Sequence, residues 1–505
     1  MTVKSRVSRA WRALTGRRTN FEAAADNRLL LEWIRGAVEA EDLVKQEAPK
    51  LRARARDLAR NNSYVVQFLT LLQNNVIGAN GVALEAKVRD NSGNLNRVIN
   101  DSIEEAWEKW SRKVTVDEKL SLVQLQKLLL RGRSTDGEFF VRLVNVGRAE
   151  NFCGLQLEPI DPDLVDHSLN DDRGAVRIVN GIEMDERGRT LAYHVLRGSK
   201  NNRQRERIPA SEIIHGYIPS QVGQHRGLTE WASVMVPLRM LHGYEEAEVV
   251  AARTAAAKMG FIKWVNPDDF DAEAAAEPVE MEANPGSIAQ LPPGAEFQSW
   301  DPTHPTNAFG DFVKSILRKI STGFRVSYNA LANDLEGVNY SSIRSGLLIE
   351  RDHWRSEQRW WIDTFLRPVY ERWLEQAVLA SAVKVDSRSF AKLLEAKWRP
   401  RGWQWVDPLK DVQASIAAVQ SGLGSRQDAL GEKGLDFEDV CEALAEEKAI
   451  AEQYGIELST GQPAPAAKNE ATDDEDGDAE DDADAKAKAK DEGRAAVRLL
   501  KRANG

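Results

Sequence analysis

The densest group of side chains that could do chemistry is the run of acids Asp161, Asp163 and Asp166, with His167 beside them. Carboxylate oxygens on a loop are the ligands that hard cations such as Mg²⁺ prefer, and a magnesium site of this kind would serve a nuclease. Turn chemistry is the simpler interpretation, because aspartates around Pro162 accept hydrogen bonds from nearby backbone N–H groups. We favour the turn, and keep a metal-dependent enzyme of DNA processing as the alternative.

Other motifs for catalysis do not occur in the sequence. It has no Gly-Lys-Ser/Thr phosphate loop, no HExxH and no GxSxG. We therefore expect no enzyme activity, no cofactor and no bound metal. His215 and His225 are interpreted as core or surface histidines. Cys153 and Cys441 lie far apart without a CxxC spacing, which predicts two small buried apolar side chains.

The elements that would position any site are helices around an antiparallel sheet region, an α+β fold. Apolar residues recur with period two between residues 138 and 217, which predicts strands at 139–146, 155–158, 176–182, 191–196 and 213–217, with a glycine turn at 185–188. Helical periodicity predicts helices at 27–61, 64–76 (capped by Ser63), 95–110, 228–258, 307–324, 341–383 (bent at most by Pro368) and 408–422. A small hairpin, 287–291 with 296–300, is expected between two of these helices.

Tryptophans concentrate in the predicted helix 341–383. Trp354, Trp361 and Trp373 could stack on nucleic-acid bases, but their spacing also makes one stripe of a helix. We interpret them as core residues.

Composition limits the class of protein. The chain has 505 residues, of which 42% are hydrophobic, so it can bury a large core, and its formal net charge is -10. Tight DNA binding needs clustered Lys and Arg, so a negative chain is better suited to letting DNA pass than to holding it. No apolar run approaches the length of a membrane span. Residues 1–26 are interpreted as a flexible basic arm. The acidic tail (460–505) is too polar to bury a core and is expected to be disordered.

Several motifs, in order along the chain, resemble the lambda-type portal proteins of tailed phages. The most specific are GQHRG (223–227), NYSSIR (339–344) and WVDPLK (405–410). Further similar stretches are 55–62, 73–78, 155–161, 180–193 and 208–215. The family usually has Arg two residues before the first glycine of GQHRG, where this chain has Gln221. That difference affects a local contact and leaves the resemblance intact.

The resemblance implies a portal fold and a non-enzymatic role. Subunits of this family form a homo-oligomeric ring of about twelve copies, a dodecamer. The ring is the head–tail connector channel at one capsid vertex of the virion, and double-stranded DNA passes through it during packaging and genome ejection. Implied partners are terminase, head–tail connector proteins and major capsid or scaffold proteins, with assembly in the host cytoplasm and no membrane. A non-pore minor capsid protein remains a further alternative.

The same resemblance divides the chain into regions. It implies a wing that begins at 27–227, a stem helix (228–260), a clip (261–305), a second stem helix (306–326), a tunnel loop (327–342), a long wing helix with a following strand (343–404) and a helical crown (405–459), between the arm and the tail. In the tunnel loop the neutral side chains of Asn329, Asn333, Asn339, Tyr340, Ser341 and Ser342 are expected to face DNA without fixing it. An ordinary loop, with Ser341 or Ser342 capping the next helix, is the alternative. In the clip the acids Asp268, Asp269, Glu280, Glu282 and Glu296 are expected to face docking partners.

Overall fold

The computed structural model describes residues 39–456 apart from 91, 173–175, 200, 257–259, 265–294, 300–308, 337, 384–389, 404–407 and 432–434. The basic arm and the acidic tail therefore lie outside the described residues. Contacts divide the chain into two units, Met1–Phe437 and Glu438–Gly505. The sheets and all but one of the described helices belong to the first unit.

Four helices open the described chain. They are α2 (Ala40–Asn61), α3 (Ser63–Val76), α4 (Arg97–Ser111) and α5 (Leu122–Asp136). The predicted cap of α3 is wrong by one residue: the Asn62 side chain accepts the Val65 N–H, and Ser63 is already helical. A capping box between Ser121 and Gln124 starts α5, a helix that the sequence analysis did not predict.

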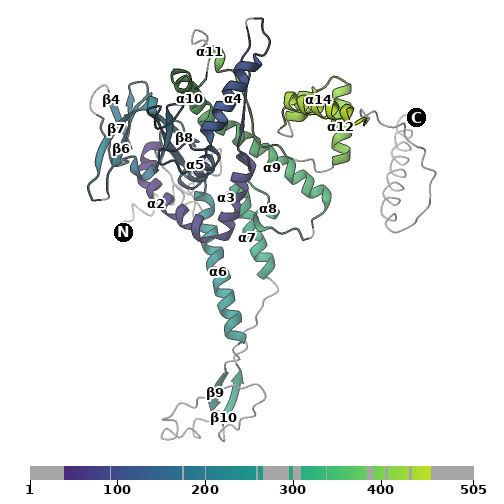
Figure 1. Cartoon of the computed structure of the whole chain (residues 1–505). Coiled ribbons are helices and arrows are strands. Elements are labelled where there is room, and N and C mark those ends of the chain that lie inside the picture. Colours follow the sequence, from purple (N-terminus) through teal and green to yellow (C-terminus); the bar gives the residue numbers. More distant parts are fainter. Residues whose placement is uncertain are drawn as a thin grey trace, which may run out of the picture. The chain divides into compact units, whose positions relative to one another are not determined.

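Two antiparallel sheets follow, as the period-two pattern predicts (Figure 1). One has the order β3-β2-β8, built from β2 (Glu138–Asn145), β3 (Leu155–Ile160) and β8 (Ile213–Tyr217). The other has the order β4-β5-β6-β7, built from β4 (Val176–Val179), β5 (Ile182–Asp185), β6 (Thr190–Arg197) and β7 (Gln204–Pro209).

The single strand predicted at 176–182 is wrong. Asn180 and Gly181 both have positive φ, 51° and 82°, so the chain makes a tight hairpin turn there and β4 pairs back onto β5. Asn-Gly favours this turn because both residues tolerate a left-handed backbone. The predicted turn at 185–188 is confirmed, with Gly188 at φ 77° between β5 and β6.

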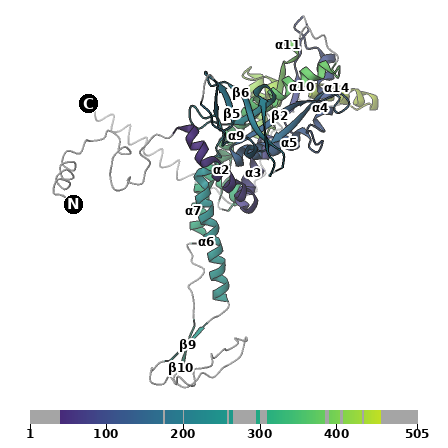
Figure 2. The same cartoon turned by 90° about the vertical axis from the view of Figure 1, so that its left-hand side faces the viewer.

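A pair of helices and a two-stranded sheet come next. Helices α6 (Ala232–Ala256) and α7 (Phe309–Phe324) lie side by side in both views (Figures 1 and 2). They are antiparallel, since ring centroids lie 6.0 Å apart for Trp231 and Phe324 and 5.0 Å apart for Tyr244 and Phe312. Strand β10 (Ala295–Ser299) pairs with β9 (Gly260–Trp264), and the predicted partner at 287–291 lies outside the described residues.

The predicted long helix after residue 340 is one continuous helical run. It comprises α9 (Tyr340–Trp361), a π-helical turn η7 (Ile362–Leu366) and α10 (Arg367–Leu379). Pro368 lies in the first turn of α10 and cannot donate a backbone hydrogen bond to the preceding turn, which is where the π-helical turn occurs. After the short α11 (Phe390–Leu393), strand β11 (Ala396–Arg399) pairs with the distant β1 (Ala83–Ala86).

Aromatic side chains fill the core between these elements. Trp354, Trp361 and Trp373 are at most 1% exposed, which confirms them as core residues. Trp373 packs edge-on against Trp107 of α4 at 5.0 Å between ring centroids. Burying several indoles in one cluster ties α4 to the continuous helical run, because each ring removes a large apolar area from water.

Three further helices complete the description. They are α12 (Pro408–Gln420), which begins at proline as predicted, α13 (Arg426–Gly431) and α14 (Phe437–Tyr454). Nearly all of α14 belongs to the second unit, where Cys441 is exposed; the prediction that it is buried is wrong, whereas Cys153 of the first unit is buried. Among the helices that the structure describes, none has an apolar stretch long enough to span a bilayer.

Candidate functional site

The segment 327–342 joins α7 to α9 and carries the predicted channel residues (Figure 1). The prediction of a simple loop is wrong in part, because Tyr328–Ala332 form a short helix, α8. Ser327 starts this helix: its side chain accepts the Ala330 N–H at 3.3 Å. Asn333 ends it with φ 53°, a left-handed conformation that asparagine tolerates.

Hydrogen bonds hold the start of the segment against its neighbours. The Ser327 N–H donates to Glu350 of α9 at 3.2 Å, and the other carboxylate oxygen of Glu350 accepts the Trp354 indole N–H at 3.2 Å. Gln67 of α3 donates to the Ala330 carbonyl at 3.1 Å, and Leu331 is buried. The segment therefore begins from a fixed base.

Acidic side chains follow α8, a feature that the sequence analysis did not single out. Asp334 accepts the Tyr328 hydroxyl at 2.7 Å and the Glu336 N–H at 2.9 Å, and these hydrogen bonds lower its pKa. Lys314 of α7 lies 3.7 Å from both Asp334 and Glu336. Burial, together with the Asp334 hydrogen bond, raises the pKa of Tyr328 to about 12, so its hydroxyl stays protonated and donating.

The predicted polar residues lie in different settings. Asn329 is half-buried within α8, whereas Asn333 and Asn339 are exposed. Tyr340, Ser341 and Ser342 form the first turn of α9, so neither serine precedes the helix as a cap, and the side chains of all three lie outside the described residues. Leu335, between the two acids, is 66% exposed. The exposed side chains of the segment thus include amides, an acid and an apolar residue.

The GQHRG stretch builds a buried anchor between the sheets and the start of α6. Arg226 is 2% exposed and donates to Glu138, which is fully buried, at 2.6 Å, and to the Asn180 carbonyl at 2.8 Å. Glu138 also accepts from Arg52 of α2 at 2.9 Å and contacts His215 at 3.1 Å. One carboxylate at the first residue of β2 therefore joins α2, β8 and the approach to α6.

Electrostatics keeps this anchor charged. Burial alone would raise the pKa of Glu138, but the positive charge of Arg226 and the hydrogen bonds from His215 and Arg226 outweigh it and hold that pKa far below its ordinary value. Burial lowers the pKa of His215, which favours the neutral ring. His225 lies 3.3 Å from Glu41 and is half-buried.

Comparison with known proteins decides the family. A family model described as phage portal protein, lambda family, matches residues 26–358. The chain belongs to the lambda family of phage portal proteins. It is 32% identical to a probable portal protein of Halomonas phage phiHAP-1, over 90% of this chain and 92% of that one, and 22% identical to portal protein B of Escherichia phage lambda, over 77% and 81%.

Solved structures similar to this portal-family chain come from gene transfer agent (GTA) particles. The neck of a native GTA particle computed with C12 symmetry is 14% identical, with a TM-score of 0.41, and the match covers 74% of this chain and 91% of that one. The virion of a native GTA particle is 12% identical, with a TM-score of 0.42, covering 77% and 94%.

In this portal protein the acidic run at 161–167 forms turns and ion pairs. Asp161 accepts the Asp163 N–H at 2.9 Å and starts a short 3-10 helix, η3 (Pro162–Leu164), as the turn interpretation predicts. Arg56 binds Asp161 at 2.7 Å and Asp163 at 2.8 Å, and Arg205 binds Asp166. Within the part of the chain that the structure describes, no group of His, Cys, Asp and Glu is arranged to hold a metal ion.

Of the five acids predicted to face docking partners of the portal, the structure describes one, Glu296. Asp268, Asp269, Glu280 and Glu282 fall outside the described residues. Glu296 is exposed on β10, directly opposite the exposed Lys263 of β9.

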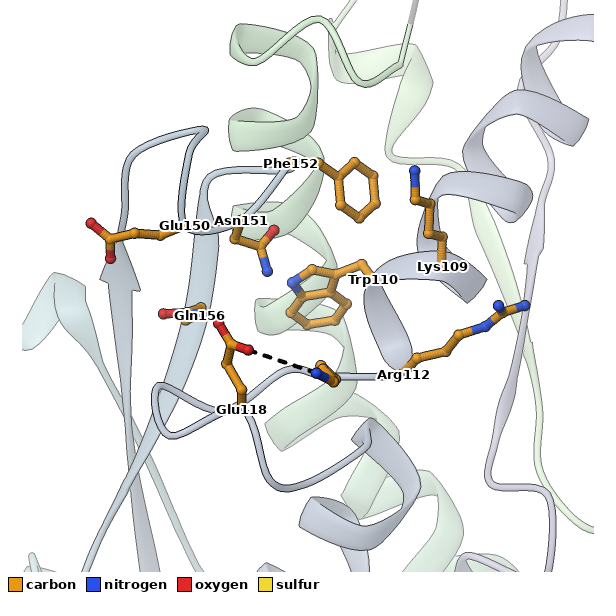
Figure 3. Close-up of a pocket in the computed structure, with 9 residues that line it drawn as sticks. Lys109, Trp110, Arg112, Glu118, Glu150, Asn151, Phe152 and Gln156 are labelled. Carbon is orange, nitrogen blue, oxygen red and sulfur yellow. Dashed lines mark ion pairs between the residues drawn. The ribbon is translucent and has the colours of Figure 1, made fainter.

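A pocket of about 340 Å³ lies apart from the 327–342 segment, between the end of α4 and the β2–β3 loop (Figure 3). Its cations already have partners: Lys113 lies 3.7 Å from Glu118, and the Lys109 ammonium lies 4.5 Å from the Phe152 ring centroid. The lining thus mixes three cations with Glu118 and Glu150, and two of the cations already make contacts within the subunit.

Proposed function

We propose that the chain is one subunit of a homo-oligomeric ring of about twelve copies that forms the DNA channel at a capsid vertex. Membership of the lambda portal family over most of the chain is the observation that carries this proposal. The ring is part of the virion, assembles in the host cytoplasm, and conducts double-stranded DNA during packaging and ejection without reading its sequence. It performs no chemistry of its own and needs no cofactor.

The helix pair and the small sheet supply the channel architecture. In this proposal α6 and α7 form the stem, the β9–β10 sheet belongs to the clip, and the elements at 27–227 and 343–404 form the wing. Residues 405–459 form the crown. Among the described strands, β9 and β10 pair only with each other, and the edges of such a small sheet can pair with another chain.

The 327–342 segment is proposed as the tunnel loop around DNA. Exposed amides at Asn333 and Asn339 can touch phosphates without fixing them, and Asn329, Tyr340, Ser341 and Ser342 complete the proposed set. Asp334 and Glu336 support the same role, because acids repel phosphates and prevent tight binding at a place where DNA must slide. The Lys314 ammonium lies 3.7 Å from each of these carboxylates and therefore offsets part of the negative charge of the segment.

The clip is proposed to dock terminase during packaging and head–tail connector proteins afterwards, while the outer part of the ring contacts major capsid or scaffold proteins. Five acids of the clip would present a negative surface to those partners: Asp268, Asp269, Glu280, Glu282 and Glu296. Of these, Glu296 is exposed on β10.

Electron microscopy of the purified full chain tests the proposal. Closed rings with a central hole are the expected result, and sedimentation should give a mass near twelve subunits of 56.4 kDa. A protein that stays monomeric at high concentration and forms no ring in particles would overturn the proposal and favour the alternative of a non-pore minor capsid protein.

A further inference from the structure

Helix α6 has an apolar outer face that is largely exposed in the part of the subunit that the structure describes. Five small or apolar residues recur at alternating intervals of four and three and so form one stripe of the helix: Val236, Met240, Gly243, Ala247 and Val250. Val236, Met240 and Val250 are 63%, 68% and 54% exposed. We call these five residues the outer face of α6.

The opposite side of α6 carries the subunit's own packing. Val234, Leu238 and Leu241 are at most 2% exposed and belong to the main core. The outer face therefore contributes nothing to that core. A row of large exposed apolar side chains on a helix is the pattern of an interaction surface.

Gly243 lies in the middle of the outer face and has open space beside it. A Cβ added there would have no heavy atom of the described residues within 4 Å. Glycine in an exposed helix interior destabilises the helix relative to alanine. Packing among the described residues does not require this glycine, and its missing side chain leaves room for the backbone of a second helix.

Helix α7 has a different outer face. Four residues of α7 are exposed at intervals of three, four and three: Phe312, Ser315, Lys319 and Thr322. Phe312 is 49% exposed and also contacts Tyr244 of its own α6, so it lies at the edge of this face. The other side of α7 packs into the core through Leu317, Ile320 and Phe324. A ring of identical subunits needs two unlike faces on each copy, because every interface joins one face to the other.

Charged residues beside the two outer faces have opposite sign when α6 of one subunit runs antiparallel to α7 of the next. Glu246 and Arg253 lie seven residues apart on exposed positions of α6, and Asp311 and Arg318 lie seven residues apart on exposed positions of α7. A register that sets Glu246 beside Arg318 therefore also sets Arg253 beside Asp311. Both pairs then have opposite charge, which selects that register over others.

From this we infer that the outer face of α6 packs against the outer face of α7 of a second copy of this chain, antiparallel, with Glu246 facing Arg318 and Arg253 facing Asp311. The inference rests on the proposed ring. It names the residues of the interface between neighbouring subunits of the ring. In this interface the two helices come closest at Gly243.

Gly243→Leu separates this interface from the fold. The leucine has open space in the single subunit and is a better helix former, so the melting temperature of the subunit should stay the same or rise. Rings should be lost, since the side chain fills the space reserved for the neighbour. Ala252→Leu is the matched control, because it adds the same side chain at an exposed position of α6 on the side of the helix opposite Gly243, and it should retain rings. Mass photometry of the full-length proteins gives both results.

Charge exchange tests the register. Glu246→Arg and Arg318→Glu should each raise the protein concentration needed for half-assembly by more than about tenfold, through like-charge contacts in every interface of the ring. The double variant should return to within about threefold of the unmodified chain. Glu186→Arg, in the exposed β5–β6 turn, is the control and should change nothing.

The outcomes distinguish this interface from the proposed function. Rings that persist in Gly243→Leu, or a double variant that assembles no better than the single ones, overturn the interface while the portal ring stands. Absence of rings from the unmodified chain overturns both.

Discussion

At the scale of single residues, Glu138 is the most consequential side chain of the subunit. It is fully buried and binds Arg226 and Arg52, and it contacts His215. Removing one partner of a buried ion pair leaves an uncompensated charge in the interior. The two arginines make that penalty larger here than at a surface pair.

Glu138→Gln should lower the free energy of unfolding by about 3–5 kcal/mol, because Arg226 and Arg52 remain buried without a carboxylate. Urea denaturation followed by tryptophan fluorescence measures the change. Glu186→Gln, an exposed acid in the β5–β6 turn, is the control and should change stability by less than about 0.5 kcal/mol. A loss of stability no larger than in the control would show that the buried cluster is not needed.

The same carboxylate predicts the acid response. The folded-state pKa of Glu138 lies far below its ordinary value of 4.5, so its contribution to stability is fully present above pH 4.5 and is lost as the pH falls toward the folded-state pKa. The unmodified chain should lose stability steeply below pH 4.5, and Glu138→Gln less steeply. Parallel acid-denaturation curves for the two proteins would contradict this assignment.

Asn339→Lys tests whether the 327–342 segment lines the channel. A lysine in every copy would place a ring of positive charge around the DNA and slow its passage, with an expected fall in packaging rate of at least about twofold. In vitro packaging with the cognate terminase measures the rate, and mass photometry verifies that rings are intact. Asn202→Lys, an exposed position in the β6–β7 turn, is the control. Equal packaging rates for the two variants would remove Asn339 from the channel wall.

At the scale of elements, the connection between α5 and β2 fixes where the helix pair begins. Gly137 ends α5 with φ 90°, and an added Cβ would lie 2.3 Å from the Leu228 carbonyl carbon. The backbone leading into α6 therefore passes directly over this glycine. The Thr229 hydroxyl also donates to the Ser134 carbonyl of α5 at 3.1 Å.

Gly137→Ala should lower the free energy of unfolding by about 3 kcal/mol or more, because the methyl group clashes with backbone and the positive φ adds strain. Gly188→Ala is the matched control: its φ is 77°, but its Cβ would meet no atom within 4 Å, so only strain of about 1 kcal/mol is expected. Thermal and urea unfolding of both variants give the comparison. Equal losses of unfolding free energy in the two variants would show that the backbone at residue 228 moves away from the added methyl group at no cost.

Local patterns in the sequence predicted most helices and strands of the first unit. They did not predict which strands pair when the two strands lie far apart in the chain. Helices α3, α4, α6, α7 and the long run from α9 to α10 follow apolar periodicity, and β2, β3, β6 and β8 follow alternation. The pairing of β1 with β11 joins residues more than 300 positions apart, and no local pattern encodes it. The Asn180–Gly181 turn was predictable from its two residues alone, since Asn-Gly is a strong hairpin signal.

The candidate site was less predictable than the fold. Asn333 and Asn339 are exposed as expected, but Asn329 is half-buried, because α8 forms inside the predicted loop. The acids Asp334 and Glu336 were visible in the sequence, yet their relation to Lys314 depends on how the segment returns against α7. The buried partners of Arg226 likewise come from three separate regions of the chain.

At the scale of the whole molecule, the ends of the chain differ from its centre in composition. Residues 461–505 are rich in Ala, Asp, Glu and Lys, and include the acidic block from Asp473 to Asp484. Such a composition offers too little apolar surface to contribute to a core. The first unit, by contrast, contains its own large core, from Ala55 to Leu393.

Truncation after Thr460 should therefore leave both folding and ring assembly intact. The melting temperature should change by less than about 2 °C, since a segment of this composition has little apolar surface to contribute to a core. Removing the acidic block also makes the subunit less negative, so any effect on assembly should vary with salt, because charge repulsion between copies is screened by ions. Differential scanning calorimetry and mass photometry at two salt concentrations measure both quantities. Loss of soluble rings at every salt concentration would mean that the tail takes part in assembly through more than its charge.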